Sequence, residues 1–403
     1  MSPSSNKESR FIKGLVRFVF LILVKPFLAI KYGYKVKNKY KIKKGEPVLV
    51  LSNHQTDLDP IFVHWSFNQV LNTVATDTIF KKGFVGWNLK KLGAIPKRKG
   101  LVDLSTNLEI VHSIKRGSSV LLFLEGNRTY ADFQFYISDK IAKLLKSVKC
   151  PIILYNIHGG TGVLPRFAHK TRKGKIYGEI KKILKPEEYM NMDDKVLADT
   201  IISNLRVIDA ESGELYKSSL KAEYLERMFF ICPHCGAVSS MVSEGNFVKC
   251  KKCNFEMEFG EDLKLHKVSK QGPDISLLDW YNLQKKWTLD YVPPKGQIIF
   301  EDDDIELVSA DVYETRERLY VGKITLTDMD LFFGELKFPL GIINIASPIS
   351  GTRFAFSDGE HNYLVRGHDR FNPLKYVLMF NRLDTNMKIK NNDNYYRLEV
   401  TEK

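Results

Sequence analysis

The chain has 403 residues, a mass of 46.4 kDa and 44% hydrophobic residues, so it is too long for one ordinary core and too apolar for a disordered or low-complexity protein. Its formal net charge is +14, but residues 1–200 hold 35 basic and 16 acidic side chains, whereas residues 201–403 hold 26 and 31. We therefore expect two or three domains and an anionic partner for the first half only. A nucleic acid and a membrane surface are the two candidates.

Residues 11–34 favour the membrane. The longest uncharged apolar run in this segment, residues 18–24, is far shorter than the roughly 20 residues that a spanning helix requires, and the segment is too interrupted for a signal peptide. Lysine and arginine side chains punctuate it, and a lysine-rich cluster at 35–44 follows, so cationic groups can reach lipid headgroups while apolar side chains enter the acyl boundary. We predict that residues 1–44 form a basic amphipathic anchor that binds phospholipids at the cytoplasmic face of a membrane. The alternative is a helix packed on the protein's own core.

Apolar runs typical of buried strands alternate with helical patterns between residues 45 and 226. Strands are predicted at 47–53, 119–126 and 150–157, and a helix is predicted at 59–71. Such alternation is typical of an α/β domain, in which a mainly parallel sheet is flanked by helices.

His54 and Asp59 follow the first of these strands, and α/β folds place their sites at such strand ends. A carboxylate five residues from a histidine can hold the imidazole in one tautomer and stabilise the cation that forms when the other ring nitrogen takes a proton. An alcohol needs a base of this kind before it can attack a carbonyl group at neutral pH. The alternative is that Asp59 only caps the helix and that His54 is an incidental loop residue.

A second group of polar residues, Glu125-Gly126-Asn-Arg128, lies at the end of the next predicted strand. Gly126 allows a positive φ or a close approach of the backbone to a ligand. Arg128 offers a planar fork of donors that suits a phosphate. Glu125 could orient that fork or accept a hydrogen bond from a substrate hydroxyl.

A third cluster places Lys97, Arg98 and Lys99 beside a predicted turn that begins at Gly93. Three neighbouring cations suit a phosphate group. The alternative is a solvated basic loop.

Four of the five cysteines form two Cys-x-x-Cys pairs, which are separated by fourteen residues, and we predict that they bind one Zn²⁺ ion: Cys232, Cys235, Cys250 and Cys253. Four thiolates satisfy a tetrahedral ion, and the spacing is close to that of a zinc-ribbon hairpin, which we place at 227–262. Since no coordination position stays open, the metal is predicted to be structural. Disulfides are the alternative, but a chain without an export signal disfavours them.

The rest of the chain divides into a helical linker at 263–295 and a C-terminal domain at 296–403. The domain shows consecutive strand-like runs separated by turn residues, and it closes with a predicted helix at 374–383. We therefore predict an all-β fold with a closing helix.

The three polar clusters, in this order and at these spacings, resemble the glycerolipid acyltransferases. The likeness covers about residues 30–190 and is closest to the 1-acyl-sn-glycerol-3-phosphate acyltransferases. Three motifs support this resemblance. In chain order they are His54-x4-Asp59, Gly-Ala-Ile-Pro with a basic turn, and Phe-x-Glu125-Gly126-x-Arg128. The resemblance predicts an acyltransferase domain at 45–226 and an enzyme of phospholipid synthesis.

The resemblance also implies a role for each cluster. His54 would be the general base on the acceptor hydroxyl, with Asp59 as its orienting partner. The acyl donor would be a thioester of coenzyme A or acyl carrier protein, and the acceptor a lysophospholipid. Its phosphate would be held by Glu125, Gly126 and Arg128, helped by the basic turn of Lys97, Arg98 and Lys99.

The C-terminal strands and closing helix resemble a pleckstrin-homology or GRAM-type domain. Because residues 201–403 are net acidic, we expect a protein partner for this domain rather than an anionic lipid, and we expect no nucleic acid at the ribbon. Two rival functions stay open. The enzyme could use a different glycerolipid acceptor, or the chain could be a catalytically inert membrane scaffold.

Overall fold

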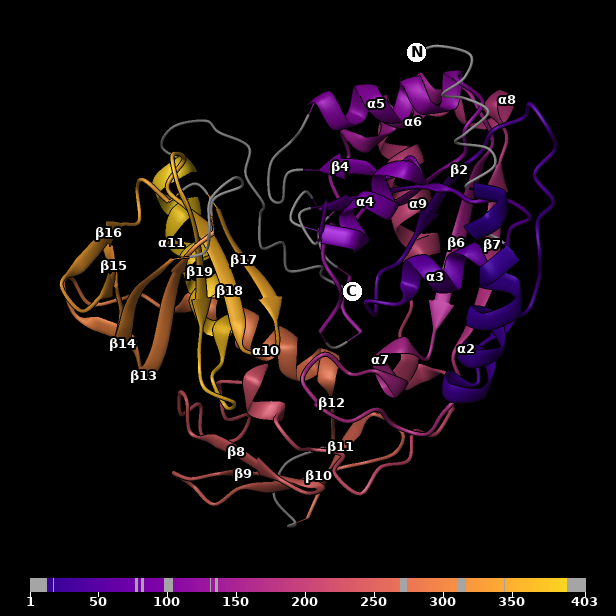
Figure 1. Cartoon of the computed structure of the whole chain (residues 1–403). Helices are drawn as coiled ribbons and strands as arrows, with labels where there is room; N and C mark the ends of the chain where they lie inside the picture. Colours follow the sequence, from indigo (N-terminus) through magenta and orange to yellow (C-terminus); the bar gives the residue numbers. More distant parts are fainter. Residues whose placement is uncertain are drawn as a thin grey trace. The chain divides into compact units, whose positions relative to one another are not determined.

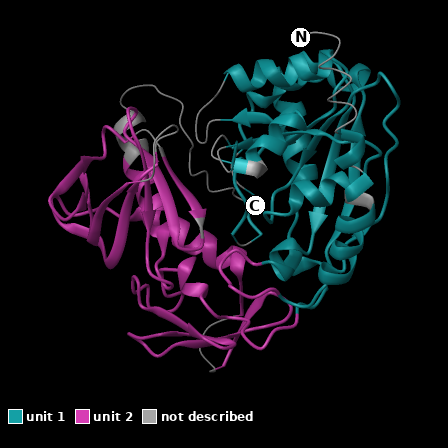
Figure 2. Ribbon diagram, viewed as in Figure 1, with its two compact units in different colours: residues 1–164, 172–216 teal, residues 165–171, 217–403 magenta. Residues whose placement is uncertain are grey.

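The computed structural model describes residues 13–16, 18–76, 79–80, 83–97, 104–130, 132–134, 137–268, 274–310, 317–343 and 345–389. The chain divides into two compact units (Figure 2). Unit 1 comprises residues 1–164 and 172–216, and unit 2 comprises residues 165–171 and 217–403. A short segment from the middle of the first unit's sequence is therefore part of the second unit.

A seven-stranded sheet forms the centre of unit 1, in the order β1-β7-β6-β2-β5-β3-β4 (Figure 1). Neighbouring strands are parallel except for the antiparallel pair β6 and β7, so the predicted mainly parallel sheet is a mixed one. Its strands are β1 (Lys35–Val36), β2 (Leu49–Ser52), β3 (Asn72–Thr76), β4 (Ile95–Lys97), β5 (Val120–Phe123), β6 (Ile152–His158) and β7 (Tyr177–Leu184).

Helices flank this sheet as predicted. They are α2 (Lys25–Tyr32), α3 (Asp59–His64), α4 (Gly83–Lys91), α5 (Leu104–Lys115), α6 (Ile141–Val148), α7 (Gly160–Val163), α8 (Pro186–Tyr189) and α9 (Asp194–Leu205), with a π-helical turn at Phe20–Val24 and a 3-10 turn at Asp209–Glu211. None of the helices in the described parts of the chain combines the length and the apolar character that a membrane crossing demands.

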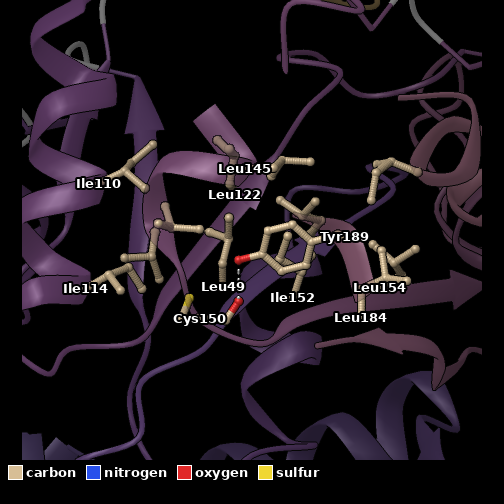
Figure 3. Close-up of a cluster of buried hydrophobic side chains, with 14 of the residues drawn as sticks. Leu49, Ile110, Ile114, Leu122, Leu145, Cys150, Ile152, Leu154, Leu184 and Tyr189 are labelled. Atoms are coloured by element: carbon tan, nitrogen blue, oxygen red, sulfur yellow. Dashed lines mark hydrogen bonds between the residues drawn. The ribbon is translucent and has the colours of Figure 1, made fainter. Parts of the chain in front are cut away.

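The main core of unit 1 lies between the sheet and helices α5, α6 and α9 (Figure 3). Alternate residues of β2 and β6, such as Leu49 and Ile152, are fully buried against side chains of these helices, such as Ile110 and Leu145. The hydroxyl of the buried Tyr189 donates to the carbonyl of Cys150 at 3.0 Å, which satisfies both polar groups inside this apolar cluster. Cys150 is a buried residue of the core, as its apolar sequence context indicates.

Two elements of unit 1 differ from the prediction. The helix predicted at 59–71 ends at His64, and Phe67 instead forms a parallel β-bridge with Tyr40. The predicted turn that begins at Gly93 leads directly into strand β4, because Ile95–Lys97 pair with β3 at the end of the sheet. Both corrections involve partners distant in sequence, which local patterns do not reveal.

Cys250 of the second cysteine pair ends strand β9 of a five-stranded antiparallel sheet in unit 2, which has the order β12-β11-β10-β9-β8. The sheet consists of β8 (Met241–Glu244), β9 (Phe247–Cys250), β10 (Glu256–Phe259), β11 (Lys264–Lys267) and β12 (Ile275–Ser276). Strands β11 and β12 fall within the predicted helical linker, so the sheet extends past residue 262. Among the described residues of that segment, the expected helix is α10 (Leu277–Asp290).

A second seven-stranded sheet of unit 2 is antiparallel throughout and has the order β16-β15-β14-β13-β19-β18-β17. Its strands are β13 (Ile298–Ser309), β14 (Arg318–Thr327), β15 (Asp330–Phe333), β16 (Leu336–Pro339), β17 (Ile345–Ser350), β18 (Arg353–Ser357) and β19 (Asn362–Arg366), followed by α11 (Pro373–Ile389). The predicted all-β domain with a closing helix is thus present. Its first strand, β13, is long, and its register with β14 shifts at three places.

Buried polar contacts join helices α10 and α11 of unit 2 to the chain around the first cysteine pair. The amide of Gln284, fully buried on α10, bonds the backbone of Phe230 and Met228 ahead of the first cysteine pair. Lys375, which is 2% exposed on α11, bonds Asp302 at 2.7 Å and the hydroxyl of Ser239 at 3.1 Å. Since each contact leaves a buried polar group unsatisfied if it breaks, these contacts stabilise the segment of the first cysteine pair against both helices.

Candidate active site and metal-binding cysteines

The candidate active site begins where β2 ends. Asn53 follows this strand, and its side-chain amide exchanges two hydrogen bonds with Ile157 of β6, at 2.9 and 2.8 Å. This bidentate contact fixes the start of the loop at residues 53–58 to the neighbouring strand. The loop therefore leaves the sheet at its carboxyl edge in a defined direction.

His54 and Asp59 meet as the sequence predicts. The Nδ1 atom of His54 lies 2.8 Å from Oδ2 of Asp59, whose side chain is fully buried at the start of α3. The imidazole is 19% exposed and stacks on the ring of Phe123, with the ring centroids 4.3 Å apart. When Nδ1 donates to the carboxylate, the lone pair of the imidazole is on Nε2, where a base needs it.

Three further hydrogen bonds hold the Asp59 carboxylate. Its Oδ2 accepts from the backbone N–H of Gln55 at 2.6 Å and from that of Thr56 at 2.9 Å, and its Oδ1 accepts from the Thr56 hydroxyl at 2.6 Å. These bonds satisfy both oxygens of the buried side chain. Asp59 therefore does more than cap a helix, because the whole loop is folded around it.

The second polar cluster lies beside the first. β5 pairs with β2 in parallel, and the Glu125 carboxylate that follows β5 accepts from the backbone N–H of His54 at 3.2 Å. The N–H of Thr129 donates to the carbonyl of His54 at 2.8 Å. Gly126 has a φ of +63°, in the left-handed region that the sequence interpretation allowed for it.

The guanidinium of Arg128 is oriented by Asp57, with Nη1 2.7 Å from Oδ2. Arg128 is largely covered, with 18% of its side chain exposed, whereas Asp57 is 80% exposed. Asp57 was not among the predicted site residues, although it stands between His54 and Asp59 in the chain. The ion pair places the fork of Arg128 next to the loop that carries the histidine.

The three basic residues of the third cluster are only partly described. Lys97 ends β4, and because β2, β5, β3 and β4 run parallel, it lies at the same edge of the sheet as His54. Arg98 and Lys99 lie outside the described residues.

Sequence reasoning missed a pair of buried carboxyl groups, Asp132 and Asp209. Burial and the neighbouring carboxylate raise the pKa of Asp132 to about 8, and burial also raises the pKa of Asp209. Asp209 accepts a hydrogen bond from the side-chain amide of Gln55 at 3.1 Å, which connects it to the histidine loop. No local motif marks these two residues, because they are 77 positions apart in the sequence.

The four paired cysteines come together in unit 2. Their sulfur atoms all lie within 4.8 Å of one another, with Cys232 and Cys253, and Cys235 and Cys250, each 3.8 Å apart. A tetrahedron with Zn–S bonds of about 2.3 Å has edges of about 3.8 Å, so the cluster could hold such an ion, whereas a disulfide needs sulfurs at about 2.05 Å.

Comparisons with known proteins agree with this picture. Residues 33–157, which include all three polar clusters, match the family model named Acyltransferase. The chain carries an acyltransferase domain. Over 195 residues it is 27% identical to the probable 1-acyl-sn-glycerol-3-phosphate acyltransferase of Mycoplasma genitalium, a match that spans 45% of this chain and 72% of that protein. The glycerolipid acyltransferase resemblance seen in the sequence is thus confirmed, together with the general reaction class of acyl transfer.

Two solved structures are similar to parts of the chain. The acyltransferase PlsC of Thermotoga maritima, described as acting on 1-acyl-sn-glycerophosphate, matches 49% of this chain and 76% of its own, at 16% identity and a TM-score of 0.40. The N-terminal pleckstrin-homology domain of human ARAP2 matches 28% of this chain and 98% of its own, at 6% identity and a TM-score of 0.21.

Proposed function

We propose that the acyltransferase domain moves a fatty acyl group from a thioester of coenzyme A or acyl carrier protein to the free hydroxyl of a lysophosphatidic acid, which gives phosphatidic acid. The observation that carries the proposal is the 2.8 Å bond between His54 and Asp59 next to the oriented guanidinium of Arg128. The pair supplies a base, and the guanidinium supplies a partner for the phosphate of the acceptor.

The reaction then needs one step of bond exchange. Nε2 of His54 takes the hydroxyl proton as the acceptor oxygen attacks the carbonyl carbon of the thioester. The C–S bond breaks, and the leaving thiolate receives the proton from the imidazolium. The buried Asp59 stabilises the imidazolium while it exists. Because the base acts directly on the acceptor, no acylated side chain is required.

The direct test is an assay of the purified full chain with labelled acyl thioester and lysophosphatidic acid. Labelled phosphatidic acid is the expected product. A panel with glycerol 3-phosphate and monoacylglycerol as acceptors distinguishes the alternative glycerolipid acceptors. If no acceptor receives the label from either donor, the proposed activity is wrong and the inert-scaffold alternative stands.

Replacing Arg128 by Ala is expected to impair phosphorylated acceptors selectively. A lost charge-assisted hydrogen bond costs about 1.5–3 kcal/mol, so KM for lysophosphatidic acid is expected to rise about 10- to 100-fold. The rate with monoacylglycerol should stay near that of the unmodified protein. Steady-state kinetics with both acceptors measure this difference.

The matched control for this variant is Arg116→Ala, because Arg116 is also paired with a carboxylate, Glu109, but on helix α5. The control should leave both KM values unchanged. An equal loss with both acceptors in Arg128→Ala would show that Arg128 does not bind the phosphate.

We further propose that the segment at residues 15–30 binds the cytoplasmic face of a membrane. Seven of its large apolar side chains are exposed: Leu15, Phe18, Val19, Ile22, Leu23, Phe27 and Ile30. A row of exposed apolar groups flanked by lysines suits a lipid surface with anionic headgroups. Such a location would bring the lipid acceptor and its product to the active site.

Replacing Ile30, which is 86% exposed, by Asp is expected to weaken membrane binding. Withdrawing one such side chain from the acyl boundary costs about 1.5–3 kcal/mol, so the partition coefficient should fall at least about 10-fold. Co-sedimentation with vesicles of phosphatidylcholine and phosphatidylglycerol measures it. Val292→Asp in unit 2, at a residue 79% exposed, is the control. Equal effects of the two variants would contradict a specific membrane segment.

For unit 2 we propose one structural Zn²⁺ ion on Cys232, Cys235, Cys250 and Cys253. All four ligands are thiolates that Zn²⁺ prefers, and they leave no position for a substrate. The antiparallel β-domain with its closing helix is proposed to be a pleckstrin-homology-like module with a protein partner, in keeping with the net acidic second half of the chain.

A further inference from the structure

Gln55 connects the catalytic loop to a part of the chain far away in sequence. Its backbone N–H donates to the Asp59 carboxylate at 2.6 Å. Its side chain is 3% exposed, and both ends of the amide are used: Oε1 accepts from the N–H of Gly160 at 2.9 Å, and Nε2 donates to Asp209 at 3.1 Å. A movement of Asp209 is therefore transmitted to the residue that holds Asp59.

Asp209 also holds the turn that Gln55 contacts. Its Oδ1 accepts from the N–H of Gly159 at 2.7 Å, and its Oδ2 accepts from that of Thr161 at 3.2 Å. The turn fits closely, since a Cβ added to Gly159 would lie 2.0 Å from the carbonyl oxygen of Lys175, and one added to Gly160 would lie 2.6 Å from the amide oxygen of Gln55. Three donors thus converge on one buried carboxylate.

Ala210, the residue after Asp209, contacts the segment that follows the second polar cluster. The N–H of Ala210 donates to the carboxyl of Asp132 at 3.0 Å. Asp132 has a φ of +59°, an uncommon value for a residue with a side chain, and it follows closely after Thr129, which bonds the carbonyl of His54. The turn at 209–210 is therefore tied to both loops of the active site.

Hydrogen bonding indicates which of the two carboxyl groups carries a charge. Burial raises the pKa of both Asp132 and Asp209, and two such neighbours do not both ionise readily. Asp209 accepts three N–H bonds, which favour the ionised form, whereas the carboxyl of Asp132 accepts a bond from the N–H of Ala210. We therefore assign the proton to Asp132 and the charge to Asp209.

We infer that Asp209 is a positioning residue for the reaction. It acts through Gln55 to hold Asp59, and with it His54, in the position that the reaction requires. It lies beyond residues 33–157, where the family model matches. The inference rests on the proposed function of His54, and its tests therefore include one readout that needs no turnover.

Asp209→Asn is the first variant, because it keeps the volume of the side chain but turns one accepting oxygen into a donor that faces other N–H groups. The expected result is a fall in kcat of about 10- to 100-fold, the scale on which small misplacements of catalytic groups act. KM for both substrates should change less than about 2-fold, since Asp209 touches neither. In a His54→Ala background the same change should have no further effect, because the group that Asp209 positions is gone.

The control for a general loss of stability is Asp193→Ala. Asp193 caps α9 of the same unit by accepting from the N–H groups of Lys195 and Val196, and its loss costs about 0.5–2 kcal/mol without touching the loop. The control should lower the melting temperature but keep kcat. If it lowers kcat as much as Asp209→Asn does, Asp209 has only a structural role and the inference is wrong.

If Asp209→Asn folds poorly, a second test exchanges the amide of residue 55 with the carboxylate of residue 209. In Gln55→Glu the new carboxylate faces that of Asp209, and the two repel. In the double variant Gln55→Glu/Asp209→Asn, an amide donates to a carboxylate again, with the direction of the bond reversed. The double variant should recover at least about 10-fold in kcat over Gln55→Glu alone. No recovery overturns the inference.

The readout without turnover is the rate at which diethyl pyrocarbonate modifies His54, followed by mass spectrometry of its peptide. When the loop is released from Asp209, the ring leaves Asp59 and Phe123, so modification should be several-fold faster in Asp209→Asn than in the unmodified chain. An unchanged rate overturns the positioning role. If the rate rises but the unmodified chain transfers no acyl group, only the proposed function fails.

Discussion

Replacing His54 by Ala is expected to lower kcat of acyl transfer by about 10²- to 10⁴-fold, the usual contribution of a positioned general base. The imidazole is held on two sides, by Asp59 at its Nδ1 atom and by Phe123 at its face, so its removal leaves no neighbour in the same position. Since the backbone of residue 54 keeps its bonds to Glu125 and Thr129, the loop should stay folded. Initial rates at saturating substrates, with the melting temperature of each variant, measure the effect.

The matched control is His112→Ala, because His112 is an exposed histidine on α5 of the same unit. It should retain full activity. Asp59→Asn should have a kcat between those of His54→Ala and His112→Ala. Its melting temperature should fall more than theirs, since the new amide would face the N–H donors of Gln55 and Thr56. Near-normal turnover of His54→Ala would remove the mechanism, whatever the other variants do.

Removal of the metal is expected to unfold unit 2 and to spare the core of unit 1. Structural zinc contributes roughly 10–16 kcal/mol of apparent binding energy in zinc-finger peptides, as much as the whole stability of an ordinary domain. The segment just before the cysteines is also bound to the rest of unit 2, because the indole of Trp280 donates to the carbonyl of Ile231 at 2.8 Å and stacks on Phe229. Loss of the ion should therefore also destabilise the seven-stranded sheet of unit 2.

Titration with a strong chelator, followed by near-ultraviolet circular dichroism, measures this loss. The signal from Trp280 and Trp287 should collapse with the release of about one zinc ion per chain. Cys250→Ser should show the same loss without chelator, whereas Cys150→Ser, at the buried cysteine of the other unit, should keep the metal. A chain that holds no zinc, or a signal that survives its release, would contradict a structural metal.

The sequence predicted best what short-range spacing controls. Five residues of a loop bring His54 to Asp59, and two Cys-x-x-Cys knuckles bring four sulfurs together, because the chain between them is too short for many alternatives. The alternation of strands and helices around these motifs likewise predicted the α/β arrangement of unit 1.

What the sequence could not reveal depends on distant partners. Asp209 bonds Gln55, which is 154 positions away in the sequence, and Arg128 bonds Asp57, which is 71 positions away. Neither contact can be predicted from a local sequence pattern. Gln284 is fully buried on α10, and its amide bonds the backbone of Phe230 and Met228, more than 50 positions away, which no pattern along the helix reveals. Short strands such as β16 have too few residues to show an alternation.

The most direct test of the central claim is a rapid-quench experiment with the purified full chain, a labelled acyl thioester and lysophosphatidic acid. The claim is that His54 activates the acceptor hydroxyl for direct attack on the donor. It predicts that the label passes straight to phosphatidic acid with none on the protein at any time, and that His54→Ala loses this transfer. Label that accumulates on the protein before the product forms, or full transfer by His54→Ala, would contradict it.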